Sequence, residues 1–408
     1  MTNSATAAAE PILLAFSGGL DTSFCVPWLK ETYGREVITV TVDTGGIDAA
    51  AAAQLAQRSQ ALGAIEHHLI DARSDYWERV LKFLVMGNTR RGQLYPLCVG
   101  AERVLQAQTI ADLAIHRKTG TVAHGCTAAG NDQVRFEVAL RTLAPGLEIL
   151  APVRDQAFKR PEQLQFLKDR HLPVPPHGAA YSINRGLWGV TIGGRETLTS
   201  EGCLPEEAWV LSAEAFTRPR PHSRHTLNFV KGVPTALDGV TMSAVTLIEH
   251  LEQLAGPYGI GRGVHLGDTV IGTKGRVAFE APAADVLLTA HRELEKLVLT
   301  GRQSRIKDSL AAPYGDLVHE GQHLDPVCRD IEALLLSSQA RVTGEVHFSL
   351  RPGSLFIEGV TSPYSLMSAS KGVYGEAAGE WSAADALGYS KMLSLPGIFY
   401  TRAGKAHS

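Results

Sequence analysis

The sequence predicts an α/β fold: a parallel sheet with helices on both faces in residues 1–172, then an α+β unit over 173–383 and a helical tail over 384–408. Two observations predict it. Strand and helix patterns alternate through the first 155 residues, and such alternation is typical of a parallel sheet covered by helices. The stretch "RHLPVPPHGAAYS" (170–182) then interrupts the alternation with three prolines and a glycine, which marks the boundary between the units.

Each element of the first unit has a local signal. The apolar run "PILLAF" predicts a strand that leads into a helix through Trp28 and Leu29. Asp48 is placed to cap an alanine-rich helix that ends at Gly63. The expected strands are 11–16, 36–43, 65–71, 121–125 and 147–152, and further helices are expected at 76–86 and 101–116.

The second unit shows a mixed pattern. Residues 225–237 read as strands, and 344–360 read as a hairpin that turns at "RPGS". Helices are expected near 241–256, 284–300 and 325–340. The last twenty or so residues predict a helix and a tail that could contact a neighbouring subunit.

Composition excludes several classes of protein. The chain has 408 residues, of which 44% are hydrophobic, and a net charge of -3, so neither nucleic acid nor a membrane is expected as a partner. The lead "MTNSATAAAEP" lacks the basic start and apolar run of a signal peptide. Five scattered cysteines without a CxxC pair, and histidines without other ligands at metal spacing, predict a cytoplasmic protein without a structural metal.

The loop "SGGLDTS" (17–23) follows the first expected strand. Gly18 and Gly19 let the backbone turn sharply and approach a ligand. Hydroxyl groups of Ser17, Thr22 and Ser23, together with the N-terminus of the helix expected near Thr22, favour an anion. A simple turn capped by Asp21 and Thr22 is the alternative that these residues alone leave open.

Two motifs together carry a family resemblance. "AFSGGLDTS" (15–23) and "HGCTAAGNDQVRFE" (124–137) resemble argininosuccinate synthase, within the PP-loop ATP pyrophosphatase superfamily. The resemblance extends from about residue 12 to about residue 400 and includes "YSINRGLWGVT" and "VIGTKGRVAFEAP". It implies a Rossmann-like adenine-nucleotide-binding domain followed by a synthetase domain. It also implies a homotetramer that joins citrulline and aspartate with ATP and Mg²⁺, through a citrullyl-adenylate, releasing AMP and pyrophosphate.

The resemblance also implies site residues. ATP would contact the loop, the end of the second strand and the second motif: Ala15, Phe16, Ser17, Gly18, Gly19, Leu20, Asp21, Thr22, Ser23, Val42 and Gly125. Ser17 and Asp21 would act in catalysis, at the departing pyrophosphate. Aspartate would be held by Thr127, Asn131 and Asp132, and citrulline by Asn131, Arg135, Ser182 and Thr191.

The resemblance is incomplete at the positions that bind citrulline in the family. In "GNTRRGQLYPLCVG" (87–100) the family's tyrosine and serine are not in place, and Tyr95 is the nearest aromatic residue. Gly267 stands where a citrulline-binding glutamate is expected, and Phe279 where a tyrosine is expected. Either a neighbouring acid binds the ammonium of citrulline, with Asp268 favoured as the candidate, or the acceptor is an N-acylated relative without that charge.

Three other functions remain as alternatives to argininosuccinate synthesis. The first is an adenylating ligase that joins aspartate to an N-acylated or otherwise modified citrulline-like ureido substrate. The second, tRNA thiolation, shares the loop but requires catalytic cysteines and a basic surface, which the sequence does not offer. The third is a nucleotide-sensing module without turnover, against which the aspartate-binding set of Thr127, Asn131 and Asp132 argues.

Overall fold

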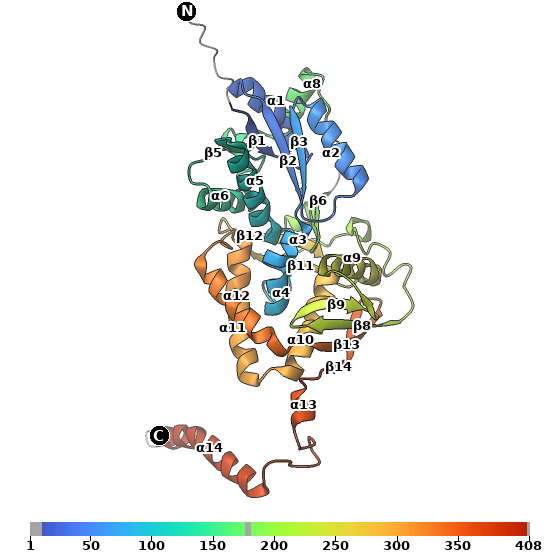
Figure 1. Ribbon diagram of the computed structural model, residues 1–408, viewed down its shortest axis with the longest axis vertical. Helices are drawn as coiled ribbons and strands as arrows, with labels where there is room; N and C mark the ends of the chain where they lie inside the picture. Colours follow the sequence, from blue (N-terminus) through green and yellow to red (C-terminus); the bar gives the residue numbers. More distant parts are fainter. Residues whose placement is uncertain (1–9, 176–180, 406–408) are drawn as a thin grey trace, which may run out of the picture.

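The computed structural model describes residues 10–175 and 181–405. The molecule is elongated, with the parallel-sheet unit at one end and the antiparallel sheets and long helices next to it (Figure 1). The last helix, α14 (Ala383–Lys405), projects away from the body at the opposite end. Nearly all of the N-terminal lead and the centre of the expected boundary at 170–182 lie outside the described residues.

The first unit is built on a five-stranded sheet whose strands are all parallel, in the order β3-β2-β1-β4-β5. Its strands are β1 (Ile12–Ala15), β2 (Val37–Asp43), β3 (Glu66–Asp71), β4 (Thr121–Ala123) and β5 (Glu148–Leu150). Its helices are α1 (Leu20–Tyr33), α2 (Ala49–Ala61), α3 (Arg73–Tyr76), α4 (Lys82–Gly87), α5 (Arg103–Arg117), α6 (Asp132–Leu143), α7 (Pro152–Asp155) and α8 (Arg160–Asp169). This topology confirms the predicted Rossmann-like fold.

The alternation of side chains along β1 explains why helices cover both faces of this sheet. Ile12 and Leu14 pack in one cluster with residues of α1 and α8, while Leu13 packs in another with residues of α5 and α6. Asp48 caps α2, as predicted, by accepting a hydrogen bond from the backbone N–H of Ala51 at 2.8 Å. Helix α1 begins at Leu20, two residues before the predicted start, and continues through Pro27 to Tyr33.

The second unit contains two antiparallel sheets, in the orders β10-β9-β8-β13-β14 and β11-β12-β7-β6. Its strands are β6 (Tyr181–Gly186), β7 (Gly189–Gly194), β8 (Ser223–Val230), β9 (Val233–Leu237), β10 (Val240–Thr241), β11 (Arg262–Asp268), β12 (Lys274–Glu280), β13 (Gly344–Arg351) and β14 (Ser354–Thr361). Its helices are α9 (Ala244–Ala255), α10 (Pro282–Val298), α11 (Gly301–His319), α12 (Pro326–Ser338) and α13 (Leu366–Ala369). Both predicted strand regions form hairpins, β8–β9 and β13–β14.

The sequence did not predict the four-stranded sheet β11-β12-β7-β6 or the helix α11. Strands β6 and β7 carry four glycines between them, at 186, 189, 193 and 194, so their apolar alternation is weak. Helix α11 contains Pro313, a residue that ordinarily argues against a helix interior. Both elements contribute residues to the candidate site.

The turn after β2 joins the two units. The backbone N–H of Leu187 donates to the carbonyl of Thr44 at 2.9 Å. Gly45, with φ +110°, lies so close that a Cβ placed on it would be 2.4 Å from the Leu187 nitrogen. Only glycine satisfies both the positive φ and this approach of two backbones.

We predict that Gly45→Ala separates the two backbones and lowers the apparent Tm. Gly63→Ala is the matched control, since Gly63 has φ +96° but nothing within 4 Å of an added methyl group. The control is expected to lose about 1 kcal/mol from backbone strain alone, and Gly45→Ala about 1–3 kcal/mol more. Thermal unfolding followed by circular dichroism measures both; equal losses would show that the Leu187 contact contributes nothing.

Candidate active site

Two adjoining cavities lie at the carboxyl ends of the parallel strands, one of about 510 Å³ and one of about 470 Å³. Their walls share the residues Asp21, Gly125, Cys126, Asp132 and Asn184. Carboxyl ends of parallel strands are where such sheets bind ligands. The first cavity opens onto the SGGLDTS loop, and the second is closed by the sheet β11-β12-β7-β6 and by His319 at the end of α11.

The loop forms the floor of the first cavity. The Ser17 and Thr22 hydroxyls lie 3.2 Å apart, and Thr22 Oγ1 also donates to the carbonyl of Gly19 at 3.3 Å. Helix α1 follows Gly19 directly, so the helix N-terminus and the hydroxyl groups converge on the same space. Arg58 of α2 donates to the Gly18 carbonyl at 2.6 Å and brings a positive charge to the loop.

Most of the residues expected to bind ATP line this cavity. They are Ala15, Phe16, Ser17, Gly19, Asp21, Thr22, Val42 and Gly125. Gly18, Leu20 and Ser23 belong to the loop but do not line the cavity. Leu20 and Ser23 are buried behind it, and the Ser23 hydroxyl donates to the Gly18 carbonyl at 3.5 Å. These three residues therefore support the loop from behind.

The cavity also contains a buried carboxylate that sequence reasoning missed. Glu102, which is 2% exposed, accepts hydrogen bonds from Thr44 Oγ1 and Arg103 Nη1, both at 2.8 Å. Burial raises the Glu102 pKa from 4.5 to about 7, against the favourable charge of Arg103. No signal in the sequence identifies this group, because Thr44 and Glu102 are 58 residues apart in the chain.

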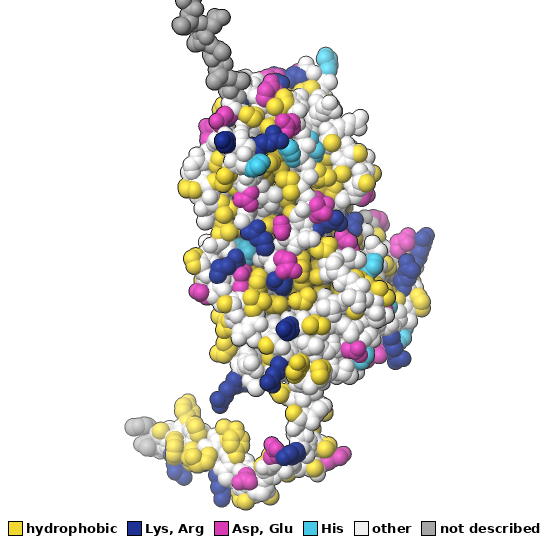
Figure 2. Space-filling model, in the orientation of Figure 1, with side chains coloured by type: hydrophobic (Ala, Val, Ile, Leu, Met, Phe, Trp, Pro, Cys, Tyr) yellow, Lys and Arg dark blue, Asp and Glu magenta, His cyan; other side chains and the backbone are white. Residues whose placement is uncertain are grey.

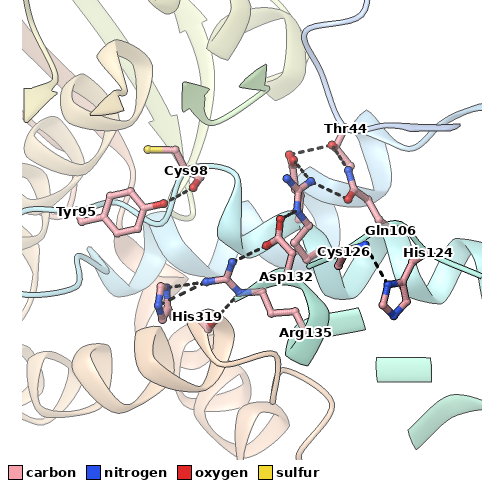
Figure 3. A network of polar contacts seen from close by, with 11 residues as sticks. Thr44, Tyr95, Cys98, Gln106, His124, Cys126, Asp132, Arg135 and His319 are labelled. Atoms are coloured by element: carbon pink, nitrogen blue, oxygen red, sulfur yellow. Dashed lines mark hydrogen bonds and ion pairs between the residues drawn. The ribbon is translucent and has the colours of Figure 1, made fainter. Parts of the chain in front are cut away.

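The second cavity is centred on an acid held between two arginines (Figure 3). Asp132 accepts from Arg103 Nε at 3.0 Å and from Arg135 Nη1 at 2.8 Å. Burial opposes ionisation of Asp132, but the charges of Arg103 and Arg135 outweigh it and lower the pKa to about 2. Asp132 is therefore a fixed negative charge on the wall between the two cavities.

Arg135 is 5% exposed and is engaged through all three of its side-chain nitrogens. Nε donates to the carbonyl of His319 at 2.7 Å, Nη1 binds Asp132, and Nη2 lies 3.1 Å from His319 Nδ1. Gly100 leaves room for this arrangement, since a Cβ there would be 3.2 Å from Arg135 Nη2. The guanidinium is thus held in one orientation before any substrate binds.

All of the residues expected to bind aspartate or citrulline line the second cavity. They are Thr127, Asn131, Asp132, Arg135, Ser182 and Thr191. They come from separate parts of the chain, from the β4–α6 loop to strands β6 and β7. Asn131 Oδ1 also accepts a hydrogen bond from the backbone N–H of Val270 at 2.9 Å, which ties this loop to the β11–β12 turn.

Aromatic rings form one end of the second cavity. The Tyr95 ring stacks on the His265 ring with centroids 5.5 Å apart and meets the Phe279 ring at 5.2 Å. The Tyr95 hydroxyl donates to the carbonyl of Cys98, as Figure 3 shows. Sequence reasoning gave Tyr95 no role, and it did not select His265 or His319. Burial lowers the pKa of both histidines, with nearby arginines adding to the effect, so both rings are neutral near pH 7.

The other histidine and cysteine side chains are scattered through the described part of the chain. Within residues 10–175 and 181–405, no group of three or more His, Cys, Asp or Glu side chains could hold a metal ion. All five cysteines are free thiols. His225 is paired with Asp238 at 2.7 Å, and His67 Nδ1 lies 2.8 Å from Thr39 Oγ1. Among the described helices, none is long and apolar enough to cross a membrane.

Comparison with known proteins gives the same family over both units. Residues 11–173 match the family described as "Arginosuccinate synthase N-terminal HUP domain", and residues 181–400 match "Arginosuccinate synthase C-terminal domain". The chain is 40% identical to the argininosuccinate synthase of Xanthomonas campestris, over 97% of this chain and 100% of that one. It is 36% identical to that of Dictyoglomus turgidum, over 97% and 98%, and 37% identical to that of Pyrobaculum aerophilum, over 97% and 100%.

We predict that Glu102 makes stability depend on pH. The folded state keeps the Glu102 proton up to about pH 7, whereas the carboxyl has its usual pKa of 4.5 in the unfolded chain. The unfolded state therefore binds fewer protons in this window, and stability falls as the pH rises through it. Glu102→Gln removes this pH-dependent contribution to stability. The Tm of the variant minus the Tm of the wild type should therefore rise from pH 4.5 to about pH 7 and stay constant above it.

The control for this prediction is Glu78→Gln, which changes a carboxylate that is 60% exposed in the same unit. Its Tm difference from the wild type should stay nearly constant across the same pH range. Calorimetric Tm values for the three proteins across this range test the assignment. Parallel curves for the wild type and Glu102→Gln would contradict it.

Proposed function

The chain belongs to the argininosuccinate synthase family, and from this membership we propose how its two cavities divide the reaction. Its activity is argininosuccinate synthesis, the ATP-dependent joining of citrulline and aspartate. We assign ATP to the cavity at the SGGLDTS loop and the two amino acids to the cavity behind Asp132. The observation that carries this assignment is the shared wall of Asp21, Gly125 and Asp132, where groups bound in the two cavities would meet.

The first step requires contact across that wall. The ureido oxygen of citrulline attacks the α-phosphorus of ATP, and pyrophosphate leaves with the electrons of the broken phosphoanhydride bond. The N–H groups at the start of α1, the Ser17 and Thr22 hydroxyls and the positive charge of Arg58 face the departing anion. Donors fixed where charge develops contribute directly to catalysis.

The second step takes place in the second cavity. Aspartate attacks the ureido carbon through its amine, after the ammonium has lost a proton, and AMP leaves as the guanidinium of the product forms. We propose that Thr127, Asn131 and Asp132 orient aspartate, and that Asn131, Arg135, Ser182 and Thr191 face citrulline. Because Arg135 is already fixed by Asp132 and His319, it acts as a preorganised group in this cavity.

Asp21 suits a magnesium ion that accompanies ATP. Its carboxylate lines both cavities beside the loop, and no hydrogen bond or ion pair occupies it among the described residues. Mg²⁺ in nucleotide sites is held by one or two carboxylates together with phosphates and water. We propose that Asp21 holds this ion, which when bound neutralises charge on the phosphates.

We also propose that the protein forms a homotetramer in the cytoplasm, in which α14 contacts a neighbouring subunit. Figure 2 shows hydrophobic side chains gathered on the projecting end of the chain. The exposed apolar residues of α14 are Leu387, Tyr389, Met392, Leu393, Ile398, Phe399 and Tyr400. An exposed apolar patch of this kind is typical of a protein–protein contact.

The assigned reaction predicts that sustained pyrophosphate release needs ATP, aspartate and a ureido acceptor together. Asp21→Asn and Ser17→Ala should each lower this rate about tenfold or more, because each removes a charge or a donor at the departing pyrophosphate. A coupled pyrophosphate assay measures these rates, and circular dichroism checks folding. Release that does not depend on aspartate would contradict the assignment, and a protein that binds ATP without turnover would be a sensing module.

The structure predicts different effects for two residues of the aspartate-binding set. Thr127→Ala should raise the KM for aspartate yet preserve isotope exchange between bridging and non-bridging oxygens of ATP, which needs only the acceptor. Asp132→Asn should raise the KM for aspartate and also slow the isotope exchange, because it releases Arg103 and Arg135 as well. From the sequence alone, Asp132 is expected to serve only the use of aspartate. Normal isotope exchange in Asp132→Asn would support that role and contradict an additional role in the first step.

A further inference from the structure

The C-terminal end of α11 is docked on the guanidinium of Arg135. The carbonyl of His319, the last residue of this helix, accepts from Arg135 Nε at 2.7 Å, and His319 Nδ1 lies 3.1 Å from Arg135 Nη2 (Figure 3). Both residues are buried. Carbonyl groups at a helix C-terminus carry partial negative charge and favour a cation there. One residue of the second unit therefore presents two acceptors to the same guanidinium.

A glycine permits this close approach. Gly321 has φ +82°, and a Cβ placed on it would lie 2.8 Å from Arg135 Cα. A residue with a side chain would have to adopt a positive φ and would also push the end of α11 away from Arg135. The contact between His319 and Arg135 is therefore built into the backbone around the end of this helix.

The His319 ring acts as an acceptor toward Arg135. An arginine side chain has donors only, so the ring nitrogen that faces it must be unprotonated. Burial lowers the His319 pKa to about 2, and the positive charges of Arg135 and Arg91 add to the effect. The imidazole is therefore neutral near pH 7 and can accept the hydrogen bond. A phenyl ring in the same place could not.

These contacts leave two donors of Arg135 for a ligand. A guanidinium has five N–H bonds, and among the described residues three of them are taken by the His319 carbonyl, the His319 ring and Asp132. One N–H bond remains on Nη1 and one on Nη2. Two such bonds on neighbouring nitrogens match the two oxygens of a carboxylate. Because Arg135 lines the second cavity, this pair is available to a substrate bound there.

We propose that His319 is a positioning residue for the carboxylate of citrulline: it holds Nε and Nη2 of Arg135 and so directs the remaining N–H bonds toward that carboxylate. This inference rests on the proposed function, which places citrulline at Arg135, and it adds the residue that orients the arginine. Asp132 also binds this guanidinium, but it is shared with Arg103. Among the described side chains, the His319 ring hydrogen-bonds that of Arg135 alone.

The test compares His319→Phe, which keeps an aromatic ring but removes the acceptor, with His319→Asn, whose amide oxygen can replace Nδ1. At saturating ATP and aspartate, His319→Phe should raise the KM for citrulline about tenfold and change kcat less than about threefold, because the lost interaction serves ground state and transition state alike. His319→Asn should restore the KM to within about threefold of the wild type. A wild-type KM in His319→Phe, or a larger loss in His319→Asn, would overturn the inference.

An acceptor without the carboxylate separates positioning from a merely structural role. In citrulline amide, a neutral carboxamide replaces the carboxylate. His319→Phe should lower kcat/KM for citrulline about tenfold but change that for the amide by less than about threefold, since only the carboxylate uses the orientation of Arg135. Equal losses for the two acceptors would indicate a general disturbance of the cavity and would overturn the inference.

The matched control is His323→Phe. His323 is also buried, hydrogen-bonds Tyr314 and Glu332, and lines neither cavity. This variant should lower the Tm but keep the KM for citrulline within about threefold of the wild type. If His319→Phe does not fold, His319→Ala, which keeps the backbone carbonyl, takes its place in both comparisons. A wild-type enzyme without aspartate-dependent pyrophosphate release would overturn the proposed function, and the inference with it; an active wild type with unchanged KM in the variant overturns the inference alone.

Discussion

The ion cluster of Arg103, Asp132 and Arg135 is the interaction on which the rest of the site depends. Asp132 forms the wall between the cavities, and both of its arginine partners are largely buried, with side chains 12% and 6% exposed. Arg103 also binds Glu102 in the first cavity, while Arg135 reaches His319 at the end of α11. One set of charges therefore joins the parallel-sheet unit to the second unit and both cavities to each other. Removing Asp132 deprives both largely buried arginines of the carboxylate they share, so substrate binding and the packing of the two units are coupled.

The sequence predicted those parts of the fold whose signals are local. The strands of the parallel sheet are short apolar runs, and the cap at Asp48 and the two hairpins follow from residues close together in the chain. It did not predict the sheet β11-β12-β7-β6, where glycines and polar residues replace the usual alternation. The predicted substrate residues do lie together in the second cavity. Groups such as Arg58, Glu102 and His319 could not be selected, because only the tertiary fold brings them to the loop or to Asp132.

Asp268, the candidate acid for the ammonium of citrulline, lines the second cavity beside Gly267. Adjacent residues in the chain suggest a short substitution of one acid for another, but Gly267 and Asp268 are consecutive on a strand. Consecutive strand residues point to opposite faces, and the Asp268 carboxylate pairs with Lys274 at 2.5 Å at the end of β11. His265, two positions before Gly267, shares its face and fills its space.

The departures at the positions expected to bind citrulline, Gly267 and Phe279, lie near the aromatic end of the second cavity. The ureido group must reach the α-phosphorus at the wall formed by Asp21, Gly125 and Asp132, so the residues there are constrained by the chemistry of both steps. His265, Gly267 and Phe279 lie away from that wall, and none of them lines the first cavity. In the proposed arrangement of substrates, they lie toward the part of citrulline that makes and breaks no bond. Contacts to a non-reacting part of a substrate contribute to selectivity through binding. The protein residues at this end of the cavity can therefore change while the residues expected to bind ATP and aspartate stay the same.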